Sequence, residues 1–322
     1  MSKYEVIIIG CGPIGMKCGI QAERRKLSYL IIEKGCLVNS VYHYPTNMTF
    51  FSTSERLEIG GVPFVSHGDK PTRREALEYF RRVKSTWNLN VHTYEKVKNV
   101  SGEKNNFIVE TDKGKYNCKN VIVSTGFYDT PNLLNIPGED LRKVKHYFDE
   151  AHPYAYHNIV VIGAGNSAVD VALETYRRGA NVTMVIRENK IKDSVKYWVK
   201  PDIENRIKEG SIKAYFNSGV TEIREKEIDV RTPKGKITID NDFVLAMTGY
   251  HPDFNFLKKM GINIKEDESQ SPKFDPNTFE TNVEGIYLAG VVCGGMNTGK
   301  YFIENSINHA VNIFNHIQAN KE

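Results

Sequence analysis

Three glycines near the N-terminus have the types and spacing that bind the phosphates of a dinucleotide. Gly10, Gly12 and Gly15 form a G-x-G-x-x-G pattern directly after an apolar run at 4–9. In such a pattern the first glycine makes a tight turn, the second lets the backbone approach a pyrophosphate, and the third lets a helix pack closely on a strand. Glu33 ends the next apolar run, where a carboxylate accepts hydrogen bonds from ribose hydroxyls. These residues predict a dinucleotide site.

A second copy of the pattern follows the apolar run at 159–162. Gly163 and Gly165 open it, and three small or polar residues continue it as Asn166, Ser167 and Ala168. Two such units in one chain are more informative than either alone, because a single G-x-G-x-x-G is common by chance. We therefore expect one unit to bind FAD and the other NADPH.

The second copy differs from the first where its next strand ends. Arg187 stands there in place of an acid, and Lys190 and Lys192 follow. A carboxylate repels a 2′-phosphate, whereas arginine and lysine pair with it, so this loop favours NADP(H) over NAD(H). The alternative is an ordinary solvated basic turn, and the neighbouring Glu188 weighs toward that alternative.

Elements that position these residues can be read from the apolar pattern. We expect strands at 30–32, 121–125, 181–186 and 243–248, and helices at 13–26, 169–178 and 300–320. Further strand pairs are expected at 107–112 with 115–118, and at 220–224, 227–232 and 236–240. Thr125-Gly126 and Thr248-Gly249 end the two central strands, where the chain crosses between nucleotide-binding domains.

Composition excludes several classes of protein. The 322 residues suffice for two domains, and 40% hydrophobic with 25% charged residues is an ordinary globular balance. A net charge of +4 without an aromatic-basic stretch of the single-strand-binding type is no nucleic-acid footprint, and no apolar run is long enough to span a membrane. The five cysteines are scattered without a Cys-x-x-Cys, so we expect free thiols, no metal site and a cytoplasmic location.

Several segments together resemble the thioredoxin-reductase-like flavoproteins. They are the first glycine-rich unit, Ser124-Thr125-Gly126, 163–170, Thr248-Gly249 and 285–290. Within that group, the segments 44–52, 61–64, 150–154 and 249–253 resemble the YpdA family of bacillithiol-disulfide reductases. The resemblance covers nearly the whole chain.

This resemblance implies an α/β fold with two Rossmann-like domains. An FAD domain of residues 1–126 and 250–322 would be interrupted by an NADPH domain of residues 127–249. The implied activity is NADPH-dependent, FAD-mediated reduction of a low-molecular-weight disulfide by a homodimer or higher homo-oligomer.

The resemblance also implies roles for individual residues. Toward FAD, the pyrophosphate would lie on Gly10, Gly12, Pro13, Ile14 and Gly15, and the adenosine end on Glu33 and Lys34. The ribityl and flavin groups would lie near Thr46, Asn47, Gly290, Val291, Phe302 and Ile303, with further FAD contacts from Val97, Thr125 and Gly126. NADPH would contact Gly163, Gly165, Asn166, Ser167, Ala168, Arg187, Lys190, Lys192, Thr248 and Gly249.

Three departures from the resembled families bear on how electrons leave the flavin. Thioredoxin reductases carry Cys-x-x-Cys, which this chain lacks, and Gly290-Val291 replaces their usual Gly-Asp. Members of the YpdA family from bacillithiol-producing bacteria have a cysteine where this chain has Ile14, and isoleucine forms no mixed disulfide. Among the remaining thiols, Cys293 is the better candidate, because a helix N-terminus and a flavin lower a thiol pKa. Cys11 is the weaker one, since we expect it to point into the packing of the strands.

Other interpretations stay open at this point. His251 could relay a proton near the flavin, although we favour the alternative that it fixes the connection between the domains. The alternatives to a disulfide reductase are an NADPH-ferredoxin or flavodoxin transferase, a flavin monooxygenase and a non-catalytic nucleotide sensor. The region 146–150 does not match the motif that monooxygenases carry between their two glycine-rich units.

Overall fold

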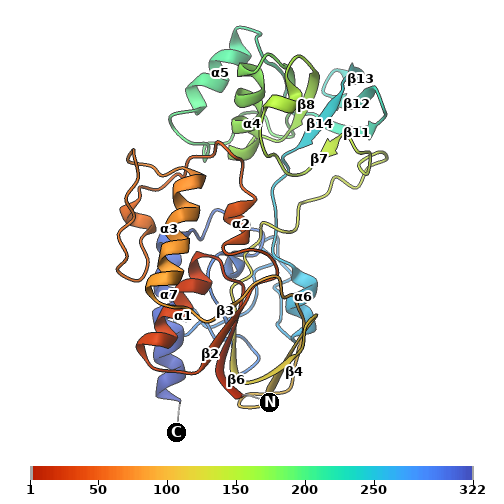
Figure 1. The fold of residues 1–322 in the computed structure, drawn as a ribbon. Coiled ribbons are helices and arrows are strands. Elements are labelled where there is room, and N and C mark those ends of the chain that lie inside the picture. The colour runs from red at the N-terminus through yellow and green to blue at the C-terminus, as the bar shows by residue number, and fades with distance from the viewer. Residues whose placement is uncertain (1–2, 321–322) are drawn as a thin grey trace. The chain divides into compact units, whose positions relative to one another are not determined.

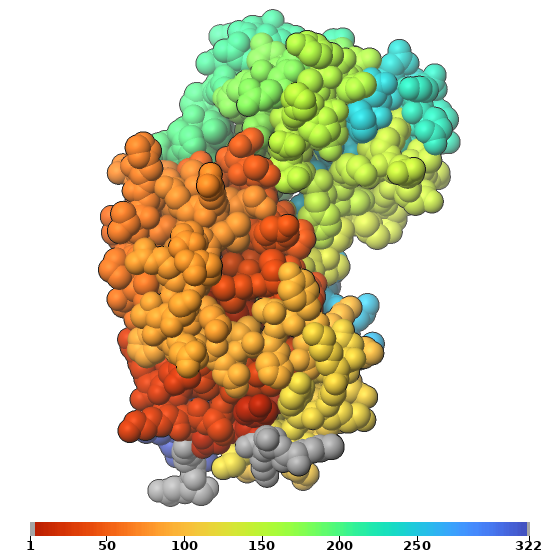
Figure 2. Space-filling model, viewed as in Figure 1, coloured from red at the N-terminus to blue at the C-terminus, as the bar shows by residue number. Residues whose placement is uncertain are grey.

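The computed structural model describes residues 3–320. Its chain divides into two compact units (Figure 1). The first contains the residues up to Thr130 together with those from Tyr250 onward, and the second is Pro131–Gly249. Each unit buries its own apolar clusters, so each has a core. Figure 2 shows the outer surface of both units from the same side.

A mixed sheet organises the first unit. Its strands run in the order β3 (Val91–His92), β2 (Tyr29–Ile32), β1 (Lys3–Ile9), β6 (Lys115–Val123), β5 (Phe107–Thr111) and β4 (Val97–Ser101). β1, β2 and β3 pair in parallel. The residues 6–9 of β1 and the whole of β2 are apolar and buried, because strands covered on both faces have no polar side.

The long strand β6 is shared between two kinds of pairing. Its first half pairs antiparallel with β5, for example Phe107 opposite Cys118. Its second half pairs in parallel with β1 on one side and with β15 (Ile286–Leu288) on the other, where Tyr287 lies opposite Ile122. Residues separated by about half the chain therefore share one sheet.

Helices cover this sheet. α1 (Pro13–Arg24) packs against the C-terminal helix α7 (Ile303–Ala319), as Figure 1 shows. α3 (Arg73–Thr86) begins with a capping box, in which Thr72 accepts from the Glu75 amide and the Glu75 side chain accepts from the Thr72 amide. Two short helices, α2 (Asn39–Tyr42) and α6 (Phe254–Lys259), complete the unit, with 3₁₀ turns at Glu55–Leu57 and Val291–Gly294.

The second unit repeats the parallel plan. The strands β10 (Lys213–Tyr215), β9 (Asn181–Val185), β8 (Asn158–Ile162), β14 (Phe243–Ala246) and β7 (Val144–Lys145) lie in that order and all pair in parallel. α4 (Asn166–Arg177) and α5 (Lys200–Lys208) belong to this unit, with a 3₁₀ turn at His152–Tyr154. A separate antiparallel sheet follows, formed by β11 (Gly219–Ile223), β12 (Glu227–Thr232) and β13 (Gly235–Asp240).

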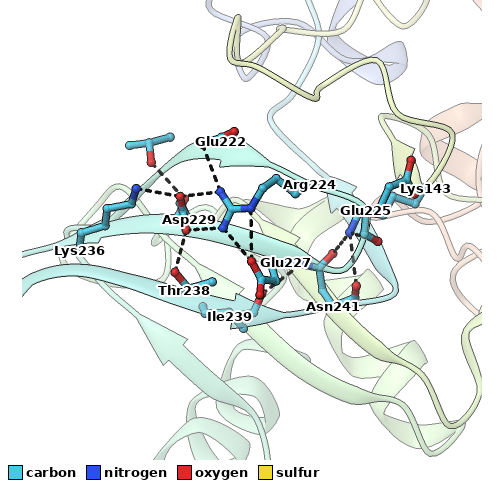
Figure 3. Close-up of polar contacts among 11 residues, drawn as sticks. Lys143, Glu222, Arg224, Glu225, Glu227, Asp229, Lys236, Thr238, Ile239 and Asn241 are labelled. Atoms are coloured by element: carbon cyan, nitrogen blue, oxygen red, sulfur yellow. Dashed lines mark hydrogen bonds and ion pairs between the residues drawn. The ribbon is translucent and has the colours of Figure 1, made fainter.

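A buried carboxylate ties this small sheet together (Figure 3). Asp229 on β12 lies 2.7 Å from Arg224 Nη1 and 2.8 Å from Lys236 Nζ, and it accepts a hydrogen bond from Thr238. These partners hold the pKa of Asp229 well below its usual range. The cluster belongs to the frame of the sheet, since every partner lies on its own three strands or their turns.

The predicted α/β class is confirmed, and strands lie in all the predicted segments. Two segments expected as separate strands, 115–118 and 121–125, belong to the single strand β6, and the strand expected at 243–248 ends at Ala246. The helix boundaries need corrections. α4 begins at Asn166, three residues before the expected start, because Gly165 already takes the N-cap position. α1 ends at Arg24 and not near Lys26, which adopts a positive φ of 55°. No helix among residues 3–320 is long and apolar enough to cross a membrane.

Candidate functional site

The first glycine-rich turn has the geometry of a phosphate cradle. Gly10 has a φ of +102°, and a Cβ there would lie 2.6 Å from the Ser124 carbonyl oxygen. A Cβ on Gly15 would lie 2.0 Å from the Gly10 carbonyl oxygen, so that close approach requires glycine. Gly12 differs, because its Cβ would meet no protein atom within 4 Å. The absent side chain at Gly12 therefore leaves open space at the start of α1, where unpaired N–H groups attract phosphate.

Glu33 joins β2 to this turn. The carboxylate is only 6% exposed, and it accepts hydrogen bonds from the Cys11 amide at 2.7 Å and the Gly35 amide at 3.0 Å. Burial raises its pKa, while the two amides act in the opposite direction. Each carboxylate oxygen has a second lone pair, so ribose binding by Glu33 stays a prediction that these contacts permit. The neighbouring Lys34 forms an ion pair with Asp129 at 2.9 Å.

The second turn repeats the design of the first. Gly163 has a φ of +130°, and a Cβ there would lie 2.5 Å from the Met247 carbonyl oxygen. A Cβ on Gly165 would meet no protein atom within 4 Å, as at Gly12. Ala168 occupies the place that Gly15 has in the first unit, and a Cβ on Gly163 would also lie 3.2 Å from the Ala168 Cβ. Both turns therefore keep one empty side-chain position at the start of a helix.

A basic loop lies beside the second turn. The side chain of Asn166 accepts a hydrogen bond from the Lys196 amide at 2.8 Å and donates one to the Ser194 carbonyl at 3.1 Å. The amide of Lys192 also donates to the Ala164 carbonyl at 3.1 Å. These bonds hold the loop that carries Arg187, Lys190 and Lys192 against the glycine turn.

The charges of this loop are paired locally. Arg187 has an 88% exposed side chain, 3.6 Å from Glu188, and Lys192 lies 3.3 Å from the same carboxylate. Lys190 lies 2.5 Å from Asp193. Such exposed pairs are weak, so the basic side chains stay available to a 2′-phosphate.

At the end of β15, four of the predicted FAD residues come together. Gly290 has a φ of +87°, and a Cβ there would lie 3.3 Å from Ile14 Cβ. A Cβ on Gly126 would lie 3.8 Å from the Val291 side chain. The first turn, the end of β6 and the end of β15 therefore converge.

The remaining predicted FAD residues are more dispersed. Thr46 and Asn47 are exposed in the loop after α2, and Phe302 caps α7 with 51% exposure, next to Ile303. Val97 is buried on β4, and Thr125 is half-buried after β6. In the second unit, the Thr248 hydroxyl donates to the Asn132 carbonyl at 2.6 Å and the Gly249 carbonyl accepts from the Asn132 amide at 2.9 Å. Their cofactor roles stay predictions.

Burial changes the expectation for the cysteines. Cys293 is 1% exposed, and burial raises the pKa of its thiol, so the lowered thiol pKa expected from the sequence is wrong. Burial likewise raises the thiol pKa of Cys11, Cys18 and the half-buried Cys36. Cys118 is buried within β6. A role for Cys293 in electron transfer stays a prediction, and its burial opposes it.

Two histidines of the first unit differ in their surroundings. His251 stacks on Phe254 with ring centroids 5.2 Å apart, and its Nδ1 lies 2.7 Å from the Pro252 carbonyl oxygen. These local contacts suit the structural interpretation of His251. His309 on α7 is 3% exposed and binds the Gly290 amide, a contact that the sequence analysis missed. Its signal was a histidine on the apolar face of the last helix, seven residues before His316.

Comparison with known proteins defines the class of protein. The chain belongs to the pyridine nucleotide-disulphide oxidoreductase family, which it matches over residues 7–290. It is therefore an enzyme, and the predicted use of FAD with NADPH is confirmed at the level of the family.

Among curated proteins, bacilliredoxin reductase Bdr of Bacillus subtilis is 46% identical over 315 residues, covering 97% of both chains. The solved structure of bacillithiol disulfide reductase Bdr (YpdA) from Bacillus cereus is 43% identical with a TM-score of 0.97, covering 99% of this chain and 100% of that one. The Staphylococcus aureus counterpart is 42% identical with a TM-score of 0.97 and full coverage of both chains. The resemblance to the YpdA family is thereby confirmed.

More distant structures share the fold alone. Thioredoxin reductase from T. acidophilum is 20% identical with a TM-score of 0.76. Flavin-containing monooxygenase from Stenotrophomonas maltophilia is 20% identical with a TM-score of 0.80. Similarity at this level does not distinguish a reductase from a monooxygenase.

Proposed function

We propose that this enzyme uses NADPH and FAD to reduce a low-molecular-weight disulfide, with bacillithiol disulfide as the first substrate to test. The observation that carries the proposal is the similarity to the Bdr proteins over almost the whole chain. In the overall reaction, NADPH, one proton and one disulfide give NADP⁺ and two thiols. The electrons of the hydride cleave the S–S bond.

The two cradles divide the cofactors between the units. We assign FAD to the discontinuous unit, because Gly12 leaves space at α1 and Glu33 follows β2. We assign NADPH to the inserted unit, where Gly165 leaves the equivalent space beside the Arg187 loop. When bound, FAD supplies hydride acceptance and transfer of an electron pair. The chain's contribution is to bind, orient and supply electrostatics, including the N-terminus of α7 near Phe302 and Ile303.

Position 14 argues against a protein thiol as the carrier of electrons. Ile14 is 7% exposed and packs against Gly290. Burial raises the thiol pKa of four cysteines, Cys11, Cys18, Cys36 and Cys293. Disulfide reduction in this chain therefore proceeds without a mixed disulfide at position 14. This observation also supports a second candidate, transfer of single electrons to ferredoxin or flavodoxin, which needs no thiol.

An anaerobic stopped-flow experiment separates the two candidates. The FAD-loaded protein is reduced with one equivalent of NADPH and mixed with bacillithiol disulfide, other small disulfides, ferredoxin, flavodoxin, quinones or oxygen. We expect the fastest reoxidation with a small disulfide and the appearance of two thiols per NADPH. Fast reoxidation by ferredoxin or flavodoxin, with none by any disulfide, would replace the first candidate by the second.

The oligomeric state and location are part of the same proposal. We expect a homodimer or higher homo-oligomer in the cytoplasm, with no nucleic-acid or membrane partner. The free cysteines of the described residues suit a reducing compartment. Light scattering during gel filtration measures the mass of the FAD-loaded protein, and a monomer of one chain contradicts the expected assembly.

A further inference from the structure

In the turn after β15, one backbone amide donates its hydrogen bond to a side chain on α7 and not to a neighbouring strand. Gly290 has a φ of +87°, so the chain leaves the sheet there in a conformation that favours glycine. Its amide N–H donates to Nδ1 of His309 on α7 at 3.1 Å. The preceding amide, of Ala289, still donates to the Val123 carbonyl at 2.9 Å. His309 therefore satisfies the first amide beyond the sheet.

His309 is packed among aromatic rings in its neutral form. Its ring stacks on Phe279 with centroids 4.0 Å apart and meets the edge of Tyr301 at 5.0 Å. Burial lowers the pKa of His309 to about 4, so the imidazole is neutral at physiological pH. Because Nδ1 accepts the hydrogen bond from Gly290, the ring proton is on Nε2.

Gly290 is enclosed on its other side as well. A Cβ on Gly290 would lie 3.3 Å from Ile14 Cβ, in the first glycine-rich turn. The thiol of Cys293 lies 3.9 Å from the same Nδ1 of His309. The turn is thus fixed between α1 and α7, and position 291 is a valine, so it offers a ligand backbone groups and no polar side chain.

We propose that His309 is a positioning residue for FAD, which holds the Gly290 turn through Nδ1 and so presents the backbone of Gly290 and Val291 to the cofactor. The inference rests on the proposed function, because it takes the convergence of Ile14, Gly126 and Gly290 as part of the FAD site. Cys293 then acts as a neutral packing partner of the imidazole.

Two amide substitutions test which ring nitrogen matters. In His309→Asn the amide oxygen takes the place of Nδ1, whereas in His309→Gln it lies nearer the place of Nε2. We expect the Asn variant to bind FAD within about threefold of the wild type, and the Gln and Leu variants to bind at least about tenfold more weakly, as for loss of one hydrogen bond to a buried amide. His316→Asn on the same helix is the matched control, because His316 contacts the Tyr287 hydroxyl and not Gly290.

A second readout needs no cofactor. Hydrogen exchange of the peptide 286–294 in the apoprotein should accelerate in the Gln and Leu variants and not in the Asn variant. The inference is overturned if Asn is as impaired as Leu in FAD affinity, or if all three variants match the wild type. These outcomes differ from failure of the proposed function, in which the wild type itself binds no FAD or reduces no disulfide.

Discussion

At the scale of single residues, the first glycine-rich turn has the geometry of a phosphate cradle, and position 14 within it is an isoleucine. The resemblance of the sequence to the YpdA family indicated that Ile14 stands where a thiol was expected. The burial of Cys293 could not be predicted from the sequence, because burial depends on how η3 (Val291–Gly294) folds beneath α7. The residue that contacts Cys293 and Gly290 is His309, which lies on the next element, α7.

Replacing Cys293 tests whether a buried thiol can carry electrons. We expect Cys293→Ser to keep both flavin reduction by NADPH and disulfide turnover within about twofold, because a thiol with a raised pKa contributes little thiolate. Stopped-flow flavin reduction and steady-state thiol release measure the two steps. Intact flavin reduction with abolished turnover would restore Cys293 as the carrier.

A single carboxylate limits the basic loop. Glu188 lies 3.6 Å from Arg187 and 3.3 Å from Lys192, so Glu188→Gln releases both side chains. We expect the KM for NADPH to fall by about two- to fivefold, in line with the modest strength of exposed ion pairs, with little change for NADH. Glu204→Gln is the control, since Glu204 lies 3.9 Å from Lys200 and forms no ion pair with Arg187 or Lys192. An unchanged or higher KM for NADPH contradicts a 2′-phosphate site at this loop.

The buried imidazole also predicts a pH dependence of stability. Burial lowers the pKa of His309 to about 4 in the folded protein, whereas an unfolded histidine titrates near about 6.5. The neutral, buried His309 therefore contributes to the free energy of unfolding. This contribution is fully present above about pH 6.5 and is lost as the pH falls toward about 4, by up to about 3 kcal/mol. Urea unfolding of the apoprotein and of His309→Asn between these pH values measures it. Parallel curves for the two proteins contradict it.

At the scale of elements, most of the strands and the two glycine turns could be predicted, because a buried parallel strand followed by a glycine pattern is a strong local signal. The sequence analysis missed α3, although Thr72 and Glu75 have the types and spacing of a capping box. The apolar stripe of this helix is short and interrupted by charged residues. α4 begins earlier than expected because a glycine at the N-cap leaves little side-chain signal. The sharing of β6 between β1, β5 and β15 could not be predicted, as register between distant strands is set by tertiary packing.

The glycines of the first turn separate folding from binding. We expect Gly12→Ala to leave the stability of the apoprotein unchanged and to weaken FAD binding, because its Cβ fills space and touches no protein atom within 4 Å. Gly15→Ala should destabilise the apoprotein by about 1–3 kcal/mol, as overpacking does, since its Cβ would lie 2.0 Å from a carbonyl oxygen. Thermal unfolding and FAD titration measure both effects. Equal FAD affinity for Gly12→Ala and the wild type contradicts the cradle.

At the scale of the whole molecule, the two chain connections to the second unit lie at 130–131 and 249–250, and backbone hydrogen bonds join the residues on each side of them. Within the first unit, the His251 amide donates to the Thr130 carbonyl at 2.9 Å. Within the second unit, the Asn132 amide donates to the Gly249 carbonyl at 2.9 Å. The two connections thus carry their own hydrogen bonds, and each unit has a separate core.

Residues 131–249 should therefore fold alone. We expect this fragment to unfold cooperatively and to bind NADP⁺ more tightly than NAD⁺, because both Gly165 and the Arg187 loop lie within it. Circular dichroism and calorimetric titration measure folding and binding, with the Gly165→Ala fragment as the control. A folded fragment that binds neither nucleotide contradicts the assignment of NADPH to this unit.

The pairing of β15 with β6 has a consequence for synthesis of the chain on the ribosome. The strand that completes the first sheet, at 286–288, emerges only after the whole of the second unit has been made. The second unit can finish folding first, while the edge of β6 that later pairs with β15 is still unpaired. During that interval an apolar strand edge is open to other chains, so prompt translation of the last residues protects the nascent enzyme from aggregation.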